Sequence, residues 1–216
     1  MTGPLVGIGG IALVLSLSEL LWQSQLIKTP EAARKFVHIL TGTFIAFWPL
    51  IMPLWTIQII SLAMVVVVMA SKYLQIFKSI HQVKRPTYGE ILFPLGICLS
   101  ATLARSEVIY TAAVLHLSLA DGFAALIGVR YKRFRYEIMG LTKTLVGTAV
   151  FYVISLLITT GVVVFSPDAF ASTGQAIVFW LPLMTTLVEN IAVYGTDNLL
   201  VPVLVIGVLN SLQTVA

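Results

Sequence analysis

Apolar segments of bilayer-crossing length follow one another along this chain, separated by short polar connections. Charged residues make up 10% of its 216 residues, whereas a soluble domain carries about 25%. A membrane-spanning helix needs about 20 apolar residues, so this length holds roughly seven or eight such helices. We therefore predict an all-α fold, a polytopic membrane helical bundle that forms a single integral membrane domain over residues 1–216. The same arithmetic leaves no room for a separate soluble domain.

Eight helical spans can be placed on the apolar pattern. We expect them at about 4–27, 31–49, 54–70, 91–104, 107–129, 142–165, 176–192 and 198–214. The third is almost purely aliphatic and is expected to face lipid, whereas Pro182 and Glu189 interrupt the seventh. Between Ser71 and Glu90, apolar side chains recur at helical spacing opposite Lys and Gln, which predicts a short helix in the membrane interface.

The cations are distributed unevenly among the connections. Of the 13 Lys and Arg residues, all but Arg105 fall on the connections between spans one and two, three and four, and five and six. Cytoplasmic loops of membrane proteins carry an excess of Lys and Arg. We therefore expect these connections in the cytoplasm and both termini outside, with the polar groups gathered at the cytoplasmic face.

Asp121 is a lone carboxylate inside an apolar run. A charge at the centre of a membrane helix costs roughly 2.5–3.5 kcal/mol on insertion scales, so an unpaired Asp there needs a partner or a function. Ala125 and Gly128 follow on the same helical face and leave a groove for a ligand or another helix. We interpret Asp121 as part of a metal and nucleotide site at one membrane face. The alternative is a structural ion pair or hydrogen bond between helices.

Lys143 and Thr144 begin the predicted sixth helix. A lysine and a hydroxyl at a helix N-terminus, where backbone N–H groups point outward, form a natural phosphate contact. The segment is not a Walker A loop, because the glycine pattern that precedes the lysine in that motif is absent. The alternative is an interfacial lysine whose side chain extends to the lipid headgroups.

Arg34, Lys35 and His38 lie near the start of the second span. Two cations beside a histidine that donates a hydrogen bond could hold a polyphosphate. The alternative is positive-inside anchoring together with one interfacial histidine.

Two cytoplasmic connections add further candidate residues. The charged, turn-like segment from Lys84 to Glu90, which includes Arg85, could close over a headgroup site or be an ordinary loop. The segment around Lys132 alternates cations with aromatic residues, a pattern that suits nucleic acid in a soluble protein. In a membrane protein we expect anionic lipid and nucleotide phosphates instead, and no nucleic-acid partner.

Oxygen-bearing side chains gather at the connection between the seventh and eighth spans. Glu189 and Asn190 are followed by a turn at Gly195 and then by Asp197 and Asn198. Carboxylate and amide oxygens are ligands that suit Mg²⁺. The alternative for Asp197 is a plain capping role at the start of the last helix.

Five short motifs occur in order along the chain. They are Arg34-Lys35-x-x-His38-x-x-x-Gly42, Tyr88-Gly89-Glu90, Asp121-Gly122-x-Ala124-x-x-x-Gly128, Lys143-Thr144-x-x-Gly147 and Asp197-Asn198-x-x-x-Pro202. Together they resemble the polyprenol kinase family, which includes dolichol kinase, phytol kinase and the CTP-dependent diacylglycerol kinase, and which is related to membrane cytidylyltransferases. Lys132 departs from the pattern, because it follows Gly128 by four residues where such proteins often carry a second glycine.

The resemblance implies a membrane kinase that transfers the γ-phosphoryl group of a nucleoside triphosphate, often CTP, to a lipid alcohol such as polyprenol, dolichol, phytol or diacylglycerol. Phosphoryl transfer requires a metal, cations around the transferring group and an aligned hydroxyl, and we take the metal to be Mg²⁺. The predicted roles are catalysis by Asp121, Lys143, His38 and Glu90; nucleotide binding by Arg34, Lys35, Lys84, Arg85, Gly122, Gly128, Lys132, Thr144, Gly147 and Asn198; and metal binding by Asp121, Asp197 and Glu189.

Two other functions stay open at this point. One is cytidylyl transfer to a phosphorylated lipid, in which the α-phosphate is attacked and pyrophosphate leaves. The other is a small transporter, although transporters favour polar groups near the bilayer midplane and the polar groups here gather at one face.

Overall fold

Helices make up nearly all of this protein. The computed structural model describes residues 2–27, 29–74, 87–131 and 134–213. Its helices and helical turns are α1 (Thr2–Gln23), α2 (Pro30–Ala46), η1 (Trp48–Leu50), α3 (Leu54–Tyr73), α5 (Gly89–Leu103), α6 (Glu107–Leu115), η2 (His116–Ala120), α7 (Asp121–Arg130), α8 (Leu145–Phe165), η3 (Asp168–Phe170), α9 (Gly174–Ile191) and α10 (Asp197–Leu212). Most of the predicted interfacial helix, between Ser71 and Glu90, lies outside the described residues.

Within the described residues, four helical segments are long and apolar enough to cross a membrane. They are Thr2–Gln23, Leu54–Tyr73, Glu107–Arg130 and Leu145–Phe165, and Gly89–Leu103 and Asp197–Leu212 are shorter apolar helices. The helical class is therefore confirmed, and these four segments are candidate membrane spans, whereas a total of roughly seven or eight spans stays a prediction. Only 11% of the spanning window of α3 is buried inside the protein, which agrees with its expected position against lipid.

The segment Glu107–Arg130 forms the centre of the bundle, and 61% of its spanning window is buried inside the protein. It runs without a break through α6, the π-helical turn η2 and α7. Two apolar cores meet on it. Leu117 belongs to the core shared with α2, α3 and α5, and Ala120 and Ala124 belong to the core shared with α8, α9 and α10. Asp121, at the start of α7, is therefore held between the two halves of the bundle.

A two-stranded hairpin, which the sequence analysis did not predict, joins α7 to α8. Strand β1 (Arg135–Ile138) pairs antiparallel with β2 (Leu141–Thr144). Met139 and Gly140 form the turn, with φ values of 49° and 73°. Positive φ at both central residues is the conformation of a tight two-residue hairpin turn, whose twist matches that of the strands.

The hairpin corrects the predicted start of the sixth helix. That helix was expected to begin at Thr142, but α8 begins at Leu145. The Thr144 hydroxyl caps it by accepting from the backbone N–H of Gly147 at 3.1 Å. Thr142 and Thr144 are β-branched, which favours a strand over a first helical turn. Lys143 therefore lies on a strand rather than on a helix.

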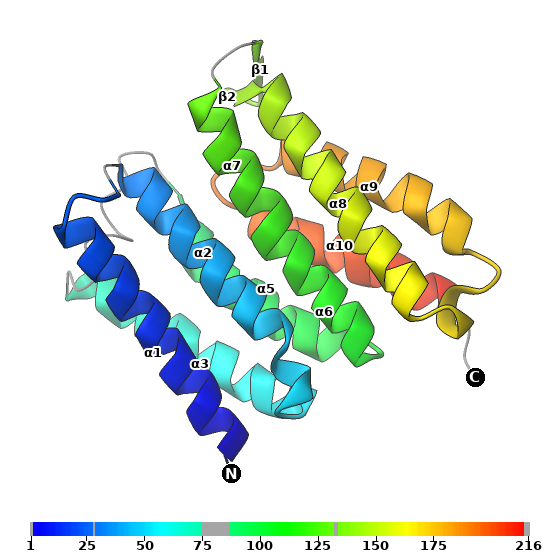
Figure 1. Ribbon diagram of the computed structural model, residues 1–216, viewed down its shortest axis with the longest axis horizontal. Coiled ribbons are helices and arrows are strands. Elements are labelled where there is room, and N and C mark those ends of the chain that lie inside the picture. Colours follow the sequence, from blue (N-terminus) through cyan, green and yellow to red (C-terminus); the bar gives the residue numbers. More distant parts are fainter. Residues whose placement is uncertain (1, 28, 75–86, 132–133, 214–216) are drawn as a thin grey trace.

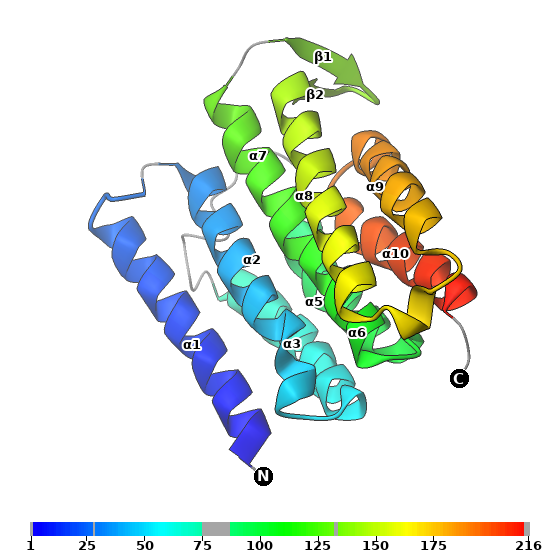
Figure 2. The same cartoon turned by 45° about the vertical axis from the view of Figure 1, so that its right-hand side comes forward.

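Glycines allow close helix contacts near the hairpin end of the bundle. A Cβ at Gly128 of α7 would lie 2.8 Å from the Thr144 hydroxyl and 3.3 Å from the Cα of Gly147. On the other side of the bundle, a Cβ at Gly96 of α5 would collide with the backbone oxygen of Asn198 in α10. Figures 1 and 2 place the hairpin at one end of the molecule, with the marked N and C ends lying away from it.

Candidate functional site

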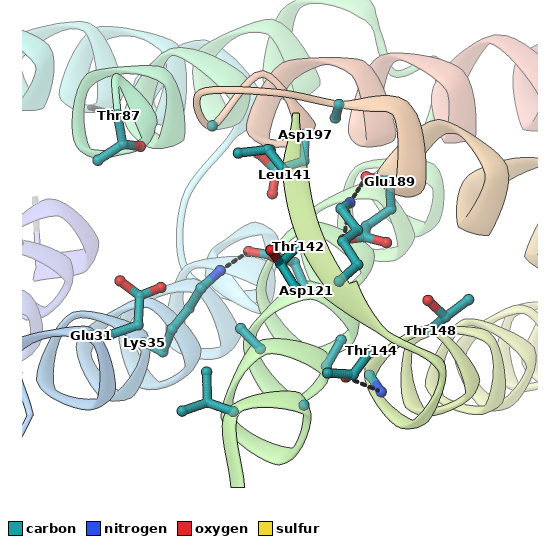
Figure 3. A pocket seen from close by; sticks show the side chains of 18 of the residues that line it. Glu31, Lys35, Thr87, Asp121, Leu141, Thr142, Thr144, Thr148, Glu189 and Asp197 are labelled. Carbon is teal, nitrogen blue, oxygen red and sulfur yellow. Dashed lines mark hydrogen bonds and ion pairs between the residues drawn. The ribbon is translucent and has the colours of Figure 1, made fainter. Parts of the chain in front are cut away.

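A cavity of about 610 Å³ lies beside the hairpin, between α2, α7, α8, α9, the start of α10 and strand β2. Ten of the predicted site residues line it, namely Arg34, Lys35, Asp121, Gly128, Lys143, Thr144, Gly147, Glu189, Asp197 and Asn198. Segments that are far apart in the sequence therefore meet in one place. Figure 3 shows Asp121, Asp197 and Glu189 around this space.

The carboxylate of Asp121, on α7, contacts two side chains of α2. Lys35 Nζ lies 2.5 Å from its Oδ2, and His38 Nε2 lies 3.1 Å from the same oxygen. All three residues are buried. Removing an ion from water costs several kcal/mol, and a close opposite charge offsets that cost. The ion pair considered as the alternative for Asp121 is therefore present, and both of its members line the cavity.

A second ion pair joins the hairpin to α9. Lys143 Nζ lies 2.8 Å from the carboxylate of Glu189 and also donates a hydrogen bond to the backbone oxygen of that residue. On the opposite strand, Tyr136 is the register partner of Lys143, and its hydroxyl donates to the side chain of Asn190. Two neighbouring residues of α9 thus hold the hairpin so that Lys143 lies at the cavity.

The turn before α10 brings Asp197 and Asn198 to the cavity. Gly195 in this turn has a φ of 89°, and a Cβ there would collide with the backbone of Gly89. The Asn198 amide donates to the Gly89 carbonyl at 3.1 Å, while its Oδ1 is buried and has no hydrogen-bond partner among the residues that the structure describes. Within the described part of the chain, the carboxylate of Asp197 also has no ion pair or hydrogen bond. Two oxygen acceptors at the cavity are therefore not used by the described residues.

Arg34 adds a further buried cation. Its Nη2 lies 2.8 Å from the carboxylate of Glu31, one turn earlier on α2, and its Nε has no hydrogen-bond partner in the described part of the chain. The lining as a whole contains four cationic side chains and four carboxylates, which are Arg34, Lys35, Arg135, Lys143, Glu31, Asp121, Glu189 and Asp197. Opposite charges are thus held close together, and between the buried members of this set the attraction is stronger than in water.

Comparison with known proteins identifies the family of this chain. No family model matches the chain, and no solved structure matches it. The chain is 32% identical over 179 residues to a phytol kinase from Synechocystis sp., and the match covers 80% of this chain and 75% of that protein. The chain belongs to the polyprenol kinase family. The resemblance drawn from the five motifs is therefore confirmed at the level of the family.

The donor set of this polyprenol kinase family member fits Mg²⁺. That ion is usually bound through one or two carboxylates together with substrate phosphates and water, rather than by a full cage of protein ligands. Asp121 and Asp197 supply carboxylates, and the unpartnered Oδ1 of Asn198 supplies a third oxygen. Among the residues that the structure describes, no group of three His, Cys, Asp or Glu side chains could hold a metal alone. Phosphate oxygens would therefore have to complete the coordination.

The other predicted site residues of this family member do not line the cavity or are not described. Glu90 pairs with Lys72 of α3, His38 lies behind the cavity wall, and Gly122 packs against Ile39 of α2. Residues outside the described part of the chain are Lys84, Arg85 and Lys132. The binding and catalytic roles predicted for these side chains stay predictions.

Several lining residues were not among the predicted site residues, including Thr87, Thr148 and Tyr194. Thr148 follows Thr144 by one helical turn, so its place at the cavity could have been found from helical spacing. Tyr194 gave no such signal, because it reaches the cavity through a long-range contact with the segment that contains Thr87. The backbone N–H of Tyr88 donates to the Tyr194 carbonyl at 2.8 Å, and this contact brings the two segments to the same side of the cavity.

Proposed function

We propose that this protein is a lipid-alcohol kinase that transfers the γ-phosphoryl group of a nucleoside triphosphate, CTP foremost, to an isoprenoid alcohol. Membership in the polyprenol kinase family supports a kinase, and the matching Synechocystis protein is a phytol kinase. The single observation that carries the proposal is the cavity that gathers cations and unpartnered acceptors at one end of an apolar helical bundle. Phytol, polyprenol, dolichol and diacylglycerol are the acceptors to compare.

The charges of the cavity suit a triphosphate with a divalent cation. Phosphoryl transfer depends on positioning and on neutralising the charge of the phosphate oxygens, more than on covalent chemistry by the protein. Lys35, Lys143 and Arg34 supply the cations that would hold the phosphates. Mg²⁺ held by Asp121, Asp197 and Asn198 would supply further charge neutralisation at the phosphate oxygens.

The acceptor alcohol is proposed to approach along α7. Beside its charged groups, the cavity has an apolar wall that contains Ala125 and Val129 of α7 and Leu141 of the hairpin. Val129 is also 54% exposed at the outer surface, so an apolar chain could reach the cavity from lipid along this helix. Of the two carboxylates predicted to be catalytic, Asp121 lines the cavity and Glu90 does not.

We further propose that the cavity faces the cytoplasm. The cavity residues Arg34, Lys35, Lys143 and Arg135 belong to the cation-rich connections of the sequence or to the helix turns beside them. Such connections lie on the cytoplasmic side of membrane proteins. The nucleotide pool of the cell would then have direct access to the site.

A labelling experiment tests the proposed function. Purified protein in lipid vesicles is incubated with CTP labelled at the γ-phosphate and, in parallel, at the α-phosphate, together with phytol. We expect the γ label, and not the α label, to appear in the lipid fraction, because a kinase moves only the terminal phosphoryl group. Protein-free vesicles are the control.

The same experiment distinguishes the other candidate functions. Cytidylyl transfer to a phosphorylated lipid would leave the α label on the lipid and release pyrophosphate. A transporter would move substrate across the vesicle membrane and leave both labels on the nucleotide. Either result would overturn the proposal of a lipid-alcohol kinase.

A further inference from the structure

A π-helical turn immediately precedes Asp121 in the central helix. In a regular α-helix the backbone N–H of Asp121 would donate to the Leu117 carbonyl, four residues earlier. Here it donates to the Ser118 carbonyl. The Asp121 N–H therefore does not occupy the Leu117 carbonyl, and His38 Nε2 lies 2.8 Å from that oxygen. Turns of this kind occur often at functional sites.

The close approach of α2 to the π-helical turn brings His38 within reach of that carbonyl. A Cβ at Gly42 of α2 would collide with the side chain of Ser118, and a Cβ at Gly122 would collide with Ile39 of α2. Glycine at both positions removes these collisions, because it lacks a Cβ. The two helices can therefore pack tightly on either side of His38.

The ring of His38 is fixed by its contacts. Its Nε2 lies 2.8 Å from the Leu117 carbonyl oxygen and 3.1 Å from Asp121 Oδ2. Because a carbonyl and a carboxylate can only accept, Nε2 must carry the proton. The ring also packs against Phe93, with 4.4 Å between the ring centroids. One N–H group is thus directed at a backbone oxygen and at the site carboxylate together.

We infer that His38 is a positioning residue that acts through Asp121, and that its contact with the Leu117 carbonyl in the π-helical turn selects the tautomer that makes this possible. His38 does not line the cavity, so it orients the carboxylate from behind while Lys35 contacts the same oxygen from the cavity side. A donor of this kind holds a carboxylate in one rotamer, as outer partners of metal ligands commonly do. The role of His38 in phosphoryl transfer rests on the proposed function, whereas the geometry of its contacts does not.

The geometry can be tested without measuring activity. The chain has three histidines, His38, His81 and His116, so ¹⁵N-histidine spectra of the protein in lipid nanodiscs are simple to assign with a His38→Gln variant. We expect Nε2 of His38 to carry a hydrogen-bonded proton, and we expect its resonance to shift in Asp121→Asn. A proton found only on Nδ1 would overturn the inference.

Kinetic measurements test the positioning role. The side-chain amide of Gln can place an N–H near the position of Nε2, whereas Leu cannot donate. We expect His38→Leu to lose roughly 10- to 100-fold in kcat or in apparent Mg²⁺ affinity, with the KM for the lipid alcohol unchanged. His38→Gln should restore most of this loss. The control is Thr41→Val, which alters a buried side chain of α2 whose hydroxyl has no hydrogen-bond partner, and it should keep wild-type kinetics.

The possible outcomes separate this inference from the proposed function. If Gln is as inactive as Leu, His38 acts by proton transfer or through its ring, and the positioning role is wrong. If Leu keeps full activity, the role is also wrong. If the wild-type protein phosphorylates no lipid alcohol, the proposed function fails, and the ¹⁵N spectra still test the tautomer and the contact with Asp121.

Discussion

Replacing Asp121 by Asn should abolish phosphoryl transfer while leaving a folded membrane protein. Asn keeps the shape and the hydrogen-bond acceptor of the side chain, so Lys35 and His38 retain an oxygen to contact. It loses the negative charge that would hold Mg²⁺ beside the triphosphate. Single electrostatic groups that stabilise a phosphoryl-transfer or oxyanion transition state are worth about 10²–10⁵ in rate. We therefore expect the rate of lipid phosphorylation to fall by roughly 10³-fold or more.

The matched control for this variant is Glu107→Gln. Glu107 is an exposed carboxylate at the other end of the same continuous helix, and its neutralisation should leave the rate unchanged. Both variants are compared with wild type for yield, for elution from a sizing column and for transfer of the γ label to lipid. Full activity in well-folded Asp121→Asn protein would remove Asp121 from the site.

Among single substitutions in the site, Lys35→Met should cause the largest loss of stability. The side chains of Lys35 and Asp121 are only 4% and 8% exposed. Removing one partner of a buried ion pair leaves an uncompensated charge, which costs about 3–5 kcal/mol. We expect the free energy of unfolding of Lys35→Met in detergent to fall by this amount. The double variant Lys35→Met with Asp121→Asn should recover most of the loss, because no charge is then left unpaired.

An exposed cation provides the comparison for Lys35→Met. Arg130 lies at the end of α7 and is exposed, so Arg130→Met should change the free energy of unfolding by no more than about 0.5 kcal/mol. Equal losses in Lys35→Met and in the double variant would mean that Lys35 stabilises the protein through packing of its aliphatic stem. The buried ion pair would then not be what holds α2 to α7.

The helices and the candidate carboxylate could be predicted from the sequence for a simple reason. A long apolar segment has few alternatives to a membrane helix, because backbone groups must be satisfied within the segment. A carboxylate inside such a segment is costly, so Asp121 stood out without any structure. The basic motifs of α2 and β2 and the pair Asp197 and Asn198 were found because charge is scarce elsewhere, and all of them line the same cavity.

What the sequence could not predict depends on contacts between distant residues. The pairing of Lys143 with Glu189 requires the hairpin, and the hairpin depends on a turn at Met139 and Gly140. The sequence of this segment also fits the start of a helix, so the turn was not predicted. The π-helical turn before Asp121 was not predicted, because a local change of helical register inside a mostly apolar helix leaves no clear periodicity signal. The total number of spans stays a prediction, since helices of intermediate length occur in both buried and spanning positions.

The central claim is that one cavity holds both the metal and the triphosphate. A structure determined in lipid nanodiscs with Mg²⁺ and a non-hydrolysable CTP analogue tests it most directly. We predict the metal beside Asp121 and Asp197, with the phosphates in contact with Lys35 and Lys143. An analogue bound outside this cavity, with the Lys35 and Asp121 ion pair undisturbed, would contradict the account.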